Sequence, residues 1–230
     1  MQASRMIYLD HNATTPVAPE VIEAMQPFFE RYWANPSSAY RLARETAAHL
    51  RRAREQAAAL IHAEPDEVVF TSCGTESINT ALAAAVRLQP AKRHIVTTAV
   101  EHSATLAFCR DLEERGYEVT RLPVQPDGSL DLGLLDQSIR PDTAIVSIMW
   151  ANNETGVIFP VAEIAAFCRA HGVWFHTDAV QAAGKTPIDV REVACDFLSL
   201  SAHKLYAPKG IGLLYVRRGT PFHPYILGGH

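Results

Sequence analysis

The chain has 230 residues, and its 21 basic and 25 acidic side chains give a formal net charge of −4. Apolar residues make up 48% and charged residues 20%, a balance that excludes a disordered, collagen-like or membrane-spanning protein. The negative net charge predicts no general attraction to nucleic acid or to an anionic membrane surface. The N-terminus leads directly into strand-like sequence without an apolar signal segment, so we expect a cytoplasmic protein.

The cysteines and histidines show no metal-binding pattern. The four cysteines are widely separated, without a Cys-x-x-Cys pair or zinc-ligand spacing, and the ten histidines include no i, i+4 pair around a glutamate. We therefore predict no metal site. Scattered cysteines in a cytoplasmic chain are most often small, inert core residues.

Strand and helix patterns alternate along the chain. Apolar runs predict strands at residues 7–10, 68–71, 94–98, 118–122, 143–150, 173–178, 197–199 and 211–216. Helical spacing predicts helices from Pro19, at about 42–62 and 75–88, at 103–115, from the cap Asp131 to near 140, and at 161–171. This alternation predicts an α/β fold with a mostly parallel sheet and helices on both faces.

Two helices have unusual composition. Pro27 lies inside the first predicted helix and is expected to bend it or end it early. The helix at about 42–62 and the residue before it carry five arginines, which could mark a nucleic-acid surface. Glu45 and Glu55 are interleaved with them and no aromatic residues accompany them, so a solvated helix face is the favoured interpretation.

Five polar loops follow strand ends, where ligand sites lie in sheets of this kind. They comprise residues 72–76, 100–102, 152–156, 178–181 and 201–204. Asp178 ends one of the strands, and Lys204 follows the end of another. A carboxylate there can keep the ring nitrogen of pyridoxal phosphate protonated, and a lysine can hold this cofactor as a Schiff base. An isolated Asp–Lys pair is more often a cap and a surface lysine, so the assignment depends on the other loops.

Residues 72–75 join a strand to a helix, where backbone N–H groups, including that of Gly74, and the Thr75 hydroxyl can bind phosphate. An ordinary Ser/Thr helix cap has the same sequence. Ser201 and His203 flank Lys204 and could bind the same phosphate.

Three further polar residues follow strand ends. His102 is suited to stack on the cofactor ring and to move protons, although a lone histidine is more often structural. Gln181 could donate a hydrogen bond to the ring's phenolic oxygen. Asn153 supplies an uncharged donor.

Several longer motifs carry a family resemblance. They are Tyr-Leu-Asp-His-Asn-Ala-Thr-Thr-Pro at 8–16, Asn-Pro-Ser-Ser at 35–38, and the segments 70–77, 101–102, 149–156, 176–181, 199–204 and 207–212. With these motifs the chain resembles the N-terminal part of a cysteine desulfurase. Such enzymes are class-V aminotransferase relatives (NifS/IscS-like), and the chain is most similar to the nitrogen-fixation NifS branch. The resemblance implies the large domain of a fold-type-I pyridoxal phosphate enzyme.

Carried over residue by residue, the resemblance implies a catalytic pair, Lys204 and His102. Lys204 would hold the cofactor as a Schiff base and Asp178 would pair with its ring nitrogen. His102 would stack on the ring, Gln181 would contact the phenolic oxygen, and Asn153 would lie near the substrate. The phosphate would be bound by Gly74, Thr75, Ser201 and His203.

The implied reaction converts L-cysteine to L-alanine and passes the sulfur, as an enzyme persulfide, to an iron–sulfur scaffold or another acceptor protein. The family resemblance also implies a homodimer. Residues 1–16 would be an N-terminal arm that belongs with the small domain, leaving apolar surface exposed here, and residues 17–230 the cofactor-binding large domain. The C-terminal small domain with its persulfide cysteine is expected to be missing, and none of the four cysteines is expected to replace it.

The chain departs from the family pattern at two positions beside the site. Ala202 replaces a glycine and Ile78 replaces an aspartate. Either the methyl group of Ala202 presses on the phosphate loop, or the loop has a conformation that accepts a Cβ. Other activities stay open: a selenocysteine lyase, an aminotransferase-like relative, or a catalytically incompetent fragment that binds the cofactor or partners only.

Overall fold

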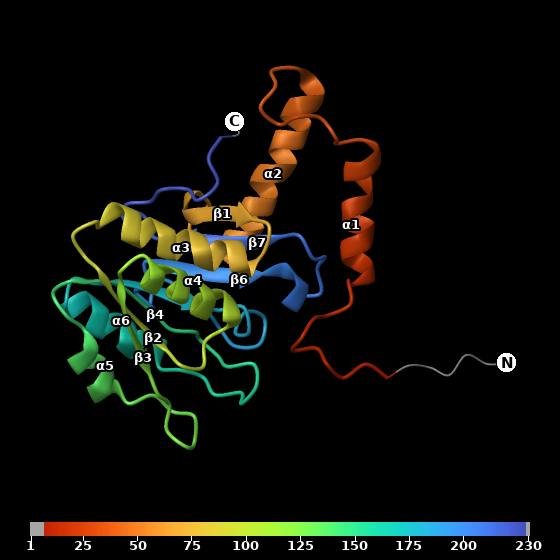
Figure 1. The fold of residues 1–230 in the computed structure, drawn as a ribbon. Coiled ribbons are helices and arrows are strands. Elements are labelled where there is room, and N and C mark those ends of the chain that lie inside the picture. Colours follow the sequence, from red (N-terminus) through yellow and green to blue (C-terminus); the bar gives the residue numbers. More distant parts are fainter. Residues whose placement is uncertain (1–6, 229–230) are drawn as a thin grey trace.

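The computed structural model describes residues 7–228, which form one sheet with helices around it (Figure 1). Within this range the sheet has seven strands in the order β1-β7-β6-β5-β4-β2-β3. The strands are β1 (Val68–Thr71), β2 (His94–Thr98), β3 (Glu118–Leu122), β4 (Thr143–Ser147), β5 (Trp174–Asp178), β6 (Phe197–Ser201) and β7 (Gly212–Val216). Strand β7 is antiparallel to both its neighbours, and the other pairs are parallel.

Helices cover both faces of the sheet, as the alternating pattern predicted. They are α1 (Pro19–Glu30), α2 (Arg41–Ala59), α3 (Gly74–Leu88), α4 (Ser103–Glu114), α5 (Leu132–Ser138) and α6 (Val161–Ala170), with short 3-10 turns η1 (Pro65–Glu67) and η2 (Ala202–Lys204). Asp131 caps α5 as expected, accepting a hydrogen bond from the Leu134 N–H at 3.0 Å.

Two apolar clusters show how adjacent strand residues divide between the faces. Ile95 and Ile145 pack in one cluster with side chains of α3 and α4. Their neighbours Val96 and Val146 point to the opposite face and pack in the other cluster with α5 and α6. Residues that alternate in this way are buried on both sides, which explains the continuous apolar runs in the sequence.

One local prediction was wrong. Residues 7–10 form no strand, and the side chains of Ile7 and Leu9 are 79% and 85% exposed. A strand needs a hydrogen-bonded neighbour, and no strand of the described chain runs beside this segment. Pro27 lies in the last turn of α1, which ends at Glu30. The carbonyl of Pro27 accepts the N–H of Arg31 at 2.8 Å.

Helix α1 lies away from the sheet, next to the far end of α2 (Figure 1), and has no buried residue. Large apolar side chains near it are exposed, among them Phe29 and Trp33 at 70% each. No helix within residues 7–228 combines the length and the apolar composition needed to cross a membrane.

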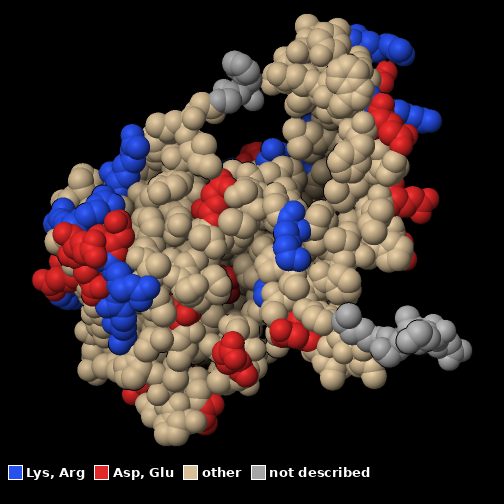
Figure 2. Space-filling model, turned by 45° about the vertical axis from the view of Figure 1, so that its right-hand side comes forward, with Lys and Arg blue, Asp and Glu red and all other residues tan. Residues whose placement is uncertain are grey.

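The arginines of α2 form the solvated face that the sequence predicted. Arg41, Arg44, Arg51 and Arg52 are exposed, and Arg54 lies over the ring of Phe70 with 4.9 Å from Cζ to the ring centroid. On the face drawn in Figure 2, basic and acidic side chains are interspersed and form no continuous basic surface.

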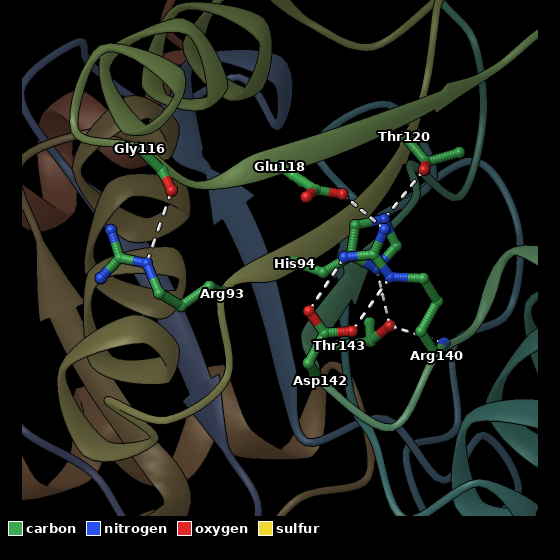
Figure 3. Close-up of polar contacts among 8 residues, drawn as sticks. All are labelled: Arg93, His94, Gly116, Glu118, Thr120, Arg140, Asp142 and Thr143. Atoms are coloured by element: carbon green, nitrogen blue, oxygen red, sulfur yellow. Dashed lines mark hydrogen bonds and ion pairs between the residues drawn. The ribbon is translucent and has the colours of Figure 1, made fainter.

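The amino ends of β2, β3 and β4 are joined by buried polar contacts (Figure 3). His94 Nδ1 pairs with Thr143 Oγ1 and His94 Nε2 with Thr120 Oγ1, each at 2.8 Å. Beside them, Arg140 bridges Glu118 and Asp142. Burial lowers the pKa of His94, so this imidazole is favoured in its neutral form. These contacts hold the edge of the sheet opposite the site described next.

Candidate active site

A cavity of about 690 Å³ lies at the edge where the parallel strands end. Cofactor and substrate sites commonly enclose a few hundred to about 1,000 Å³. All the residues predicted from the polar loops line this cavity: Gly74, Thr75, His102, Asn153, Asp178, Gln181, Ser201, His203 and Lys204. They come from loops after β1, β2, β4, β5 and β6, because parallel strands bring their carboxyl ends to one edge.

The amino end of α3 forms one wall of the cavity. Cys73, the residue before the helix, has an extended backbone, and no side-chain cap occupies the helix end. A Cβ at Gly74 would lie 3.1 Å from Val180 Cγ2 and 3.4 Å from Ser201 Cβ, so the absence of a side chain lets the loop approach β6. The exposed Thr75 hydroxyl and the open helix N–H groups together form an anion-binding surface.

Gly212, at the start of β7, lets this loop reach its position. It pairs with Thr71 on one side and with Ser201 on the other. A Cβ at Gly212 would lie 2.6 Å from the carbonyl carbon of Cys73 and 2.7 Å from Thr71 Oγ1. The glycine therefore sets how closely the Cys73–Gly74 loop packs against β7.

Asp178 ends β5 and is 6% exposed. Its Oδ1 accepts the N–H of Val180 at 2.9 Å, and no ion pair to it is found within residues 7–228. Burial raises the pKa of Asp178, while His102 and Lys204 act in the opposite direction. A buried carboxylate on a cavity wall is strongly stabilised by a cationic or N–H-bearing ligand group.

Lys204 ends the η2 turn after β6. Its Nζ donates to two backbone carbonyls of the N-terminal segment, that of Asn12 and, at 2.7 Å, that of Ala13. Burial and the nearby charge of Lys185 lower the pKa of Lys204, whereas Asp10 and Asp178 raise it. The site thus favours the neutral amine more than water does, and the neutral amine is the nucleophilic form of lysine.

His102 is the residue before α4, and its Nδ1 accepts the N–H of Ala104 at 3.1 Å. A ring nitrogen that accepts a hydrogen bond carries no proton. The cap therefore fixes the neutral tautomer with the hydrogen on Nε2. Nε2–H is therefore the group left to donate a hydrogen bond into the cavity that His102 lines.

The segment 10–15 lies against the turn that carries Lys204. The His203 carbonyl accepts both the N–H and the hydroxyl of Thr15 at 2.9 Å, and His203 Nδ1 pairs with Thr14 Oγ1 at 3.1 Å. Burial lowers the pKa of His203 most, and the nearby charge of Lys204 lowers it further. Ala202 has no positive φ, so the turn accepts its Cβ.

Two amides complete the cavity wall. Gln181 Nε2 donates to the Asn12 carbonyl at 3.0 Å. Asn153 contacts the same segment, because its carbonyl accepts Asn12 Nδ2 at 3.3 Å, and its own Nδ2 donates to Glu154 Oε1 at 2.6 Å. Asn12 therefore joins two loops across the mouth of the site.

The sequence analysis gave no role to Asn12, Ala13 or Glu101. Glu101 is buried, and its Oε1 accepts the Thr98 hydroxyl at 2.7 Å and the Met149 N–H at 3.0 Å. Its Oε2 has no hydrogen-bond partner, and burial raises the pKa of Glu101 to about 8. Its place just after the fully buried strand β2, in the polar loop 100–102, was the signal that could have identified it.

Cys109, Cys168 and Cys195 are buried, as predicted, and burial raises the pKa of each thiol to about 12. Thiols of this kind are unreactive at neutral pH. Cys73 is half-buried and lines the cavity. Within the described residues, no three His, Cys, Asp or Glu side chains are grouped closely enough to hold a metal ion.

Comparison with known proteins agrees with this geometry. Cysteine desulfurase of Trichormus azollae is 52% identical over 225 residues, which cover 98% of this chain and 56% of that protein. Cysteine desulfurase NifS of Azotobacter vinelandii is 49% identical over 225 residues, 97% of this chain and 56% of that protein. The chain thus spans little more than half the length of these curated relatives.

Solved structures show the same fold. A NifS-like protein superposes with a TM-score of 0.94 at 40% identity, covering 97% of this chain and 62% of that one. SspA in complex with cysteine superposes with a TM-score of 0.93 at 40% identity, covering 97% and 65%.

The family match is continuous. The family described as aminotransferase class-V matches residues 7–230, nearly the whole chain. Class-V aminotransferases and cysteine desulfurases are pyridoxal phosphate enzymes. The resemblance inferred from the motifs is confirmed, and the chain belongs to the class-V aminotransferase family.

Proposed function

We propose that the chain is the cofactor-binding part of a pyridoxal phosphate-dependent cysteine desulfurase, which converts L-cysteine to L-alanine and passes on the sulfur as a persulfide. The observation that carries the proposal is the buried, unpaired Asp178 carboxylate on the wall of a cavity that Lys204 also lines. The names of the relatives, and the neighbour that binds cysteine, support this reaction and substrate.

The residues present fit the cofactor. The cavity offers a carboxylate for a protonated ring nitrogen, an open helix end for a phosphate and a lysine of lowered pKa for an aldehyde. These three groups match the three reactive parts of pyridoxal phosphate. The first residue of α3 is Gly74, which has no side chain, and no side-chain cap occupies this helix end.

Bound pyridoxal phosphate would supply an electron sink for negative charge that develops on the substrate. Asp178 would hold a proton on the ring nitrogen, and Lys204 would bind the aldehyde carbon through Nζ. His102 would stack on the ring, and would move a proton once its Nδ1 leaves the helix cap at Ala104. The phosphate would be held by Gly74, Thr75, Ser201 and His203.

Two amides would orient the ring and the substrate. Gln181 would donate from Nε2 to the phenolic oxygen, and Asn153 would lie on the substrate side. Both groups already lie beside the cavity, on loops joined by Asn12. Neither adds charge, so the ionic character of the site stays with Asp178, Lys204 and the phosphate.

The proposal includes the whole protein's organisation. Residues 1–16 form an N-terminal arm and residues 17–230 the large domain; residues 1–6, 229 and 230 lie outside the described range. The active protein is a homodimer, and its sulfur acceptor is an iron–sulfur scaffold or another acceptor protein. The N-terminal contacts to the Lys204 turn support a role for the arm beside the site.

The cofactor assignment is tested by titrating the purified chain with pyridoxal phosphate, reducing the adduct with borohydride and mapping the modified lysine. Lys92, Lys185, Lys204 and Lys209 are the candidates. We expect modification of Lys204, and loss of the visible absorption band in Lys204→Ala but not in the control Lys209→Ala. Trapping at another lysine, or a band unchanged by Lys204→Ala, contradicts the proposal.

The reaction is tested by adding L-cysteine and a reductant to the cofactor-loaded chain and measuring alanine and sulfide. Alanine and sulfide in equal amounts support a desulfurase. Formation of a keto acid indicates the aminotransferase-like alternative, and turnover of selenocysteine alone indicates a selenocysteine lyase. Cofactor binding without any turnover indicates a fragment that binds but does not catalyse.

A further inference from the structure

A second lysine lies beside the candidate site and is not used by the proposed reaction. Lys185 Nζ donates to Gln181 Oε1 at 2.7 Å and to Asn12 Oδ1 at 3.1 Å. The carbonyl of Asn12 in turn accepts Gln181 Nε2 at 3.0 Å and Lys204 Nζ. Lys185, Gln181, Asn12 and Lys204 therefore form one connected hydrogen-bond network at the mouth of the cavity.

Lys185 determines which way the Gln181 amide faces. An ammonium group can only donate hydrogen bonds, so the amide atom that faces it must be the oxygen. The NH₂ group of Gln181 must then lie on the other side, where Asn12 and the cavity are. With a neutral, smaller side chain at position 185, both orientations of the amide become accessible.

The same ammonium fixes the amide of Asn12. Asn12 Oδ1 faces Lys185, and Asn12 Nδ2 therefore donates to the Asn153 carbonyl. This orientation keeps the segment 10–15 across the cavity mouth, with its carbonyls at Lys204. Lys185 thus orients both the Gln181 amide and the Asn12 amide, which lie on the two sides of the cavity mouth.

The backbone holds Lys185 in place. Gly184 before it has a φ of +71°, and a Cβ there would lie 2.8 Å from Leu205 Cδ2, next to Lys204. The N–H of Lys185 donates to the Ala182 carbonyl at 3.0 Å. A residue other than glycine at 184 would be strained, so the turn presents the lysine in one direction.

Charge gives Lys185 a second effect on Lys204. Burial lowers the pKa of Lys204 most, and Lys185 is the next cause. The opposing charges around Lys204 are Asp10 and Asp178. His203, the preceding residue, has its own pKa lowered by burial and by Lys204. A positive neighbour favours the neutral amine, which is the form that can bind an aldehyde.

We propose that Lys185 is a positioning residue of the candidate cofactor site, which directs the NH₂ group of Gln181 into the cavity and fastens Asn12 over Lys204. The inference rests on the proposed function for the identity of the ligand. The network itself is a property of the chain without any ligand.

The first test uses the cofactor-free chain. The chain is produced with ¹³C-labelled lysine and titrated by NMR, with the Lys204 signal assigned by its absence in Lys204→Arg. We expect Lys185→Met to raise the pKa of Lys204 and Lys185→Arg to restore it. Lys209→Met, which removes an exposed charge after the same turn, is the matched control. An unchanged Lys204 pKa in Lys185→Met overturns the electrostatic role.

The second test measures pyridoxal phosphate affinity from the visible absorption band. We expect Lys185→Met to weaken binding about threefold to tenfold, the loss expected for one hydrogen bond, and Lys185→Arg to recover most of it. In a Gln181→Ala background the Lys185→Met effect should shrink, because the part that acts through the glutamine is lost and only the effects on Asn12 and Lys204 remain. Additive losses overturn the positioning role.

The two proposals fail in different ways. If Lys204→Ala abolishes cofactor binding but Lys185→Met binds as the unchanged chain does, the positioning role is wrong and the proposed function stands. If no variant binds pyridoxal phosphate, the proposed function is wrong, and the cofactor-free titration still decides whether Lys185 acts on Lys204. Circular dichroism of each variant checks that the fold is retained.

Discussion

The Asp178 carboxylate lies 2.9 Å from the backbone nitrogen of Val180, which donates the hydrogen bond found to it within residues 7–228. The side chain is buried, and burial raises its pKa. The chain without ligand therefore buries this carboxyl group with no ion-pair partner among the described residues. Such a group lowers stability and is retained where a ligand uses it.

Asp178→Asn should stabilise the cofactor-free chain and weaken cofactor binding. Folding raises the pKa of the Asp178 carboxyl. The stability that Asp178 contributes is therefore fully present below the pKa that it has in the unfolded chain, and it is lost as the pH rises toward the folded-state pKa. We expect the variant to be more stable at neutral pH by on the order of 1 kcal/mol, with the difference shrinking toward pH 4. Urea unfolding with and without pyridoxal phosphate measures both effects. A variant that is less stable at neutral pH and binds the cofactor normally would contradict this reading.

Glu101→Gln should remove a large pH dependence of stability. Burial raises the pKa of Glu101 from 4.5 to about 8, so the unchanged chain loses stability as the pH rises across that window. The loss is on the order of 4 kcal/mol when complete. Glutamine keeps an Oε1 acceptor for Thr98 and Met149 and cannot ionise.

The free energy of unfolding of both proteins, measured by urea at several pH values between about 5 and 9, checks this prediction. The advantage of Glu101→Gln over the unchanged chain should grow as the pH rises. Glu114→Gln, on the last turn of α4, removes an exposed carboxylate and is the control. Parallel pH profiles for the unchanged chain and Glu101→Gln would show that Glu101 is already ionised in the fold.

Gly212→Ala should displace the loop at the amino end of α3. The new methyl carbon would lie 2.6 Å from the carbonyl carbon of Cys73, a backbone atom that must move. Overpacking of this kind costs about 1–3 kcal/mol. Thermal unfolding and cofactor titration measure the two effects, and both stability and affinity should fall.

Gly133→Ala is the matched control for this substitution. Gly133 lies in α5, where alanine is the better helix former and a Cβ would lie 3.2 Å from the Asp131 side chain. We expect it to leave cofactor affinity unchanged. Equal affinities in Gly212→Ala and Gly133→Ala would mean that the loop adapts without loss of the anion-binding surface.

The site could be predicted largely because it follows from one rule of parallel sheets. Asp178 ends β5 and Lys204 follows the end of β6, and parallel strands bring those ends together whatever the intervening sequence. The polar residues after each strand therefore indicated the cavity before any contact was known. Their chemical roles, in contrast, follow from the family resemblance and stay predictions.

The residues that the sequence did not indicate make contacts between distant parts of the chain. Asn12 binds Gln181, 169 residues away, and Lys185, 173 residues away, and no periodic pattern marks such a pair. The strand predicted at residues 7–10 does not form, for a related reason. The segment has the apolar composition of a strand, but a strand also needs a hydrogen-bonded neighbour. The direction of β7 is likewise set by its pairing with β1 and β6.

The histidine at the centre of β5 should make the fold sensitive to acid. His176 is buried, with Nδ1 paired to Ser147 Oγ at 2.8 Å and Nε2 to Ser199 Oγ at 2.9 Å, so it joins β4, β5 and β6. Burial lowers its pKa from 6.5 to about 3. The folded state keeps the ring neutral while the unfolded chain takes up a proton below about pH 6.5, so stability falls as the pH decreases toward 3.

Between neutral pH and pH 5, His176 should lower the free energy of unfolding of the unchanged chain by about 2 kcal/mol, since each pKa unit corresponds to 1.36 kcal/mol. His176→Gln should be less stable at neutral pH, because it weakens the bridge between Ser147 and Ser199, and should lose less on acidification. Urea unfolding at about pH 7 and pH 5 measures the difference. His171→Gln, which removes a more exposed histidine at the end of α6, should keep the acid loss of the unchanged chain. An equal acid loss in His176→Gln would place the acid-sensitive group elsewhere in the chain.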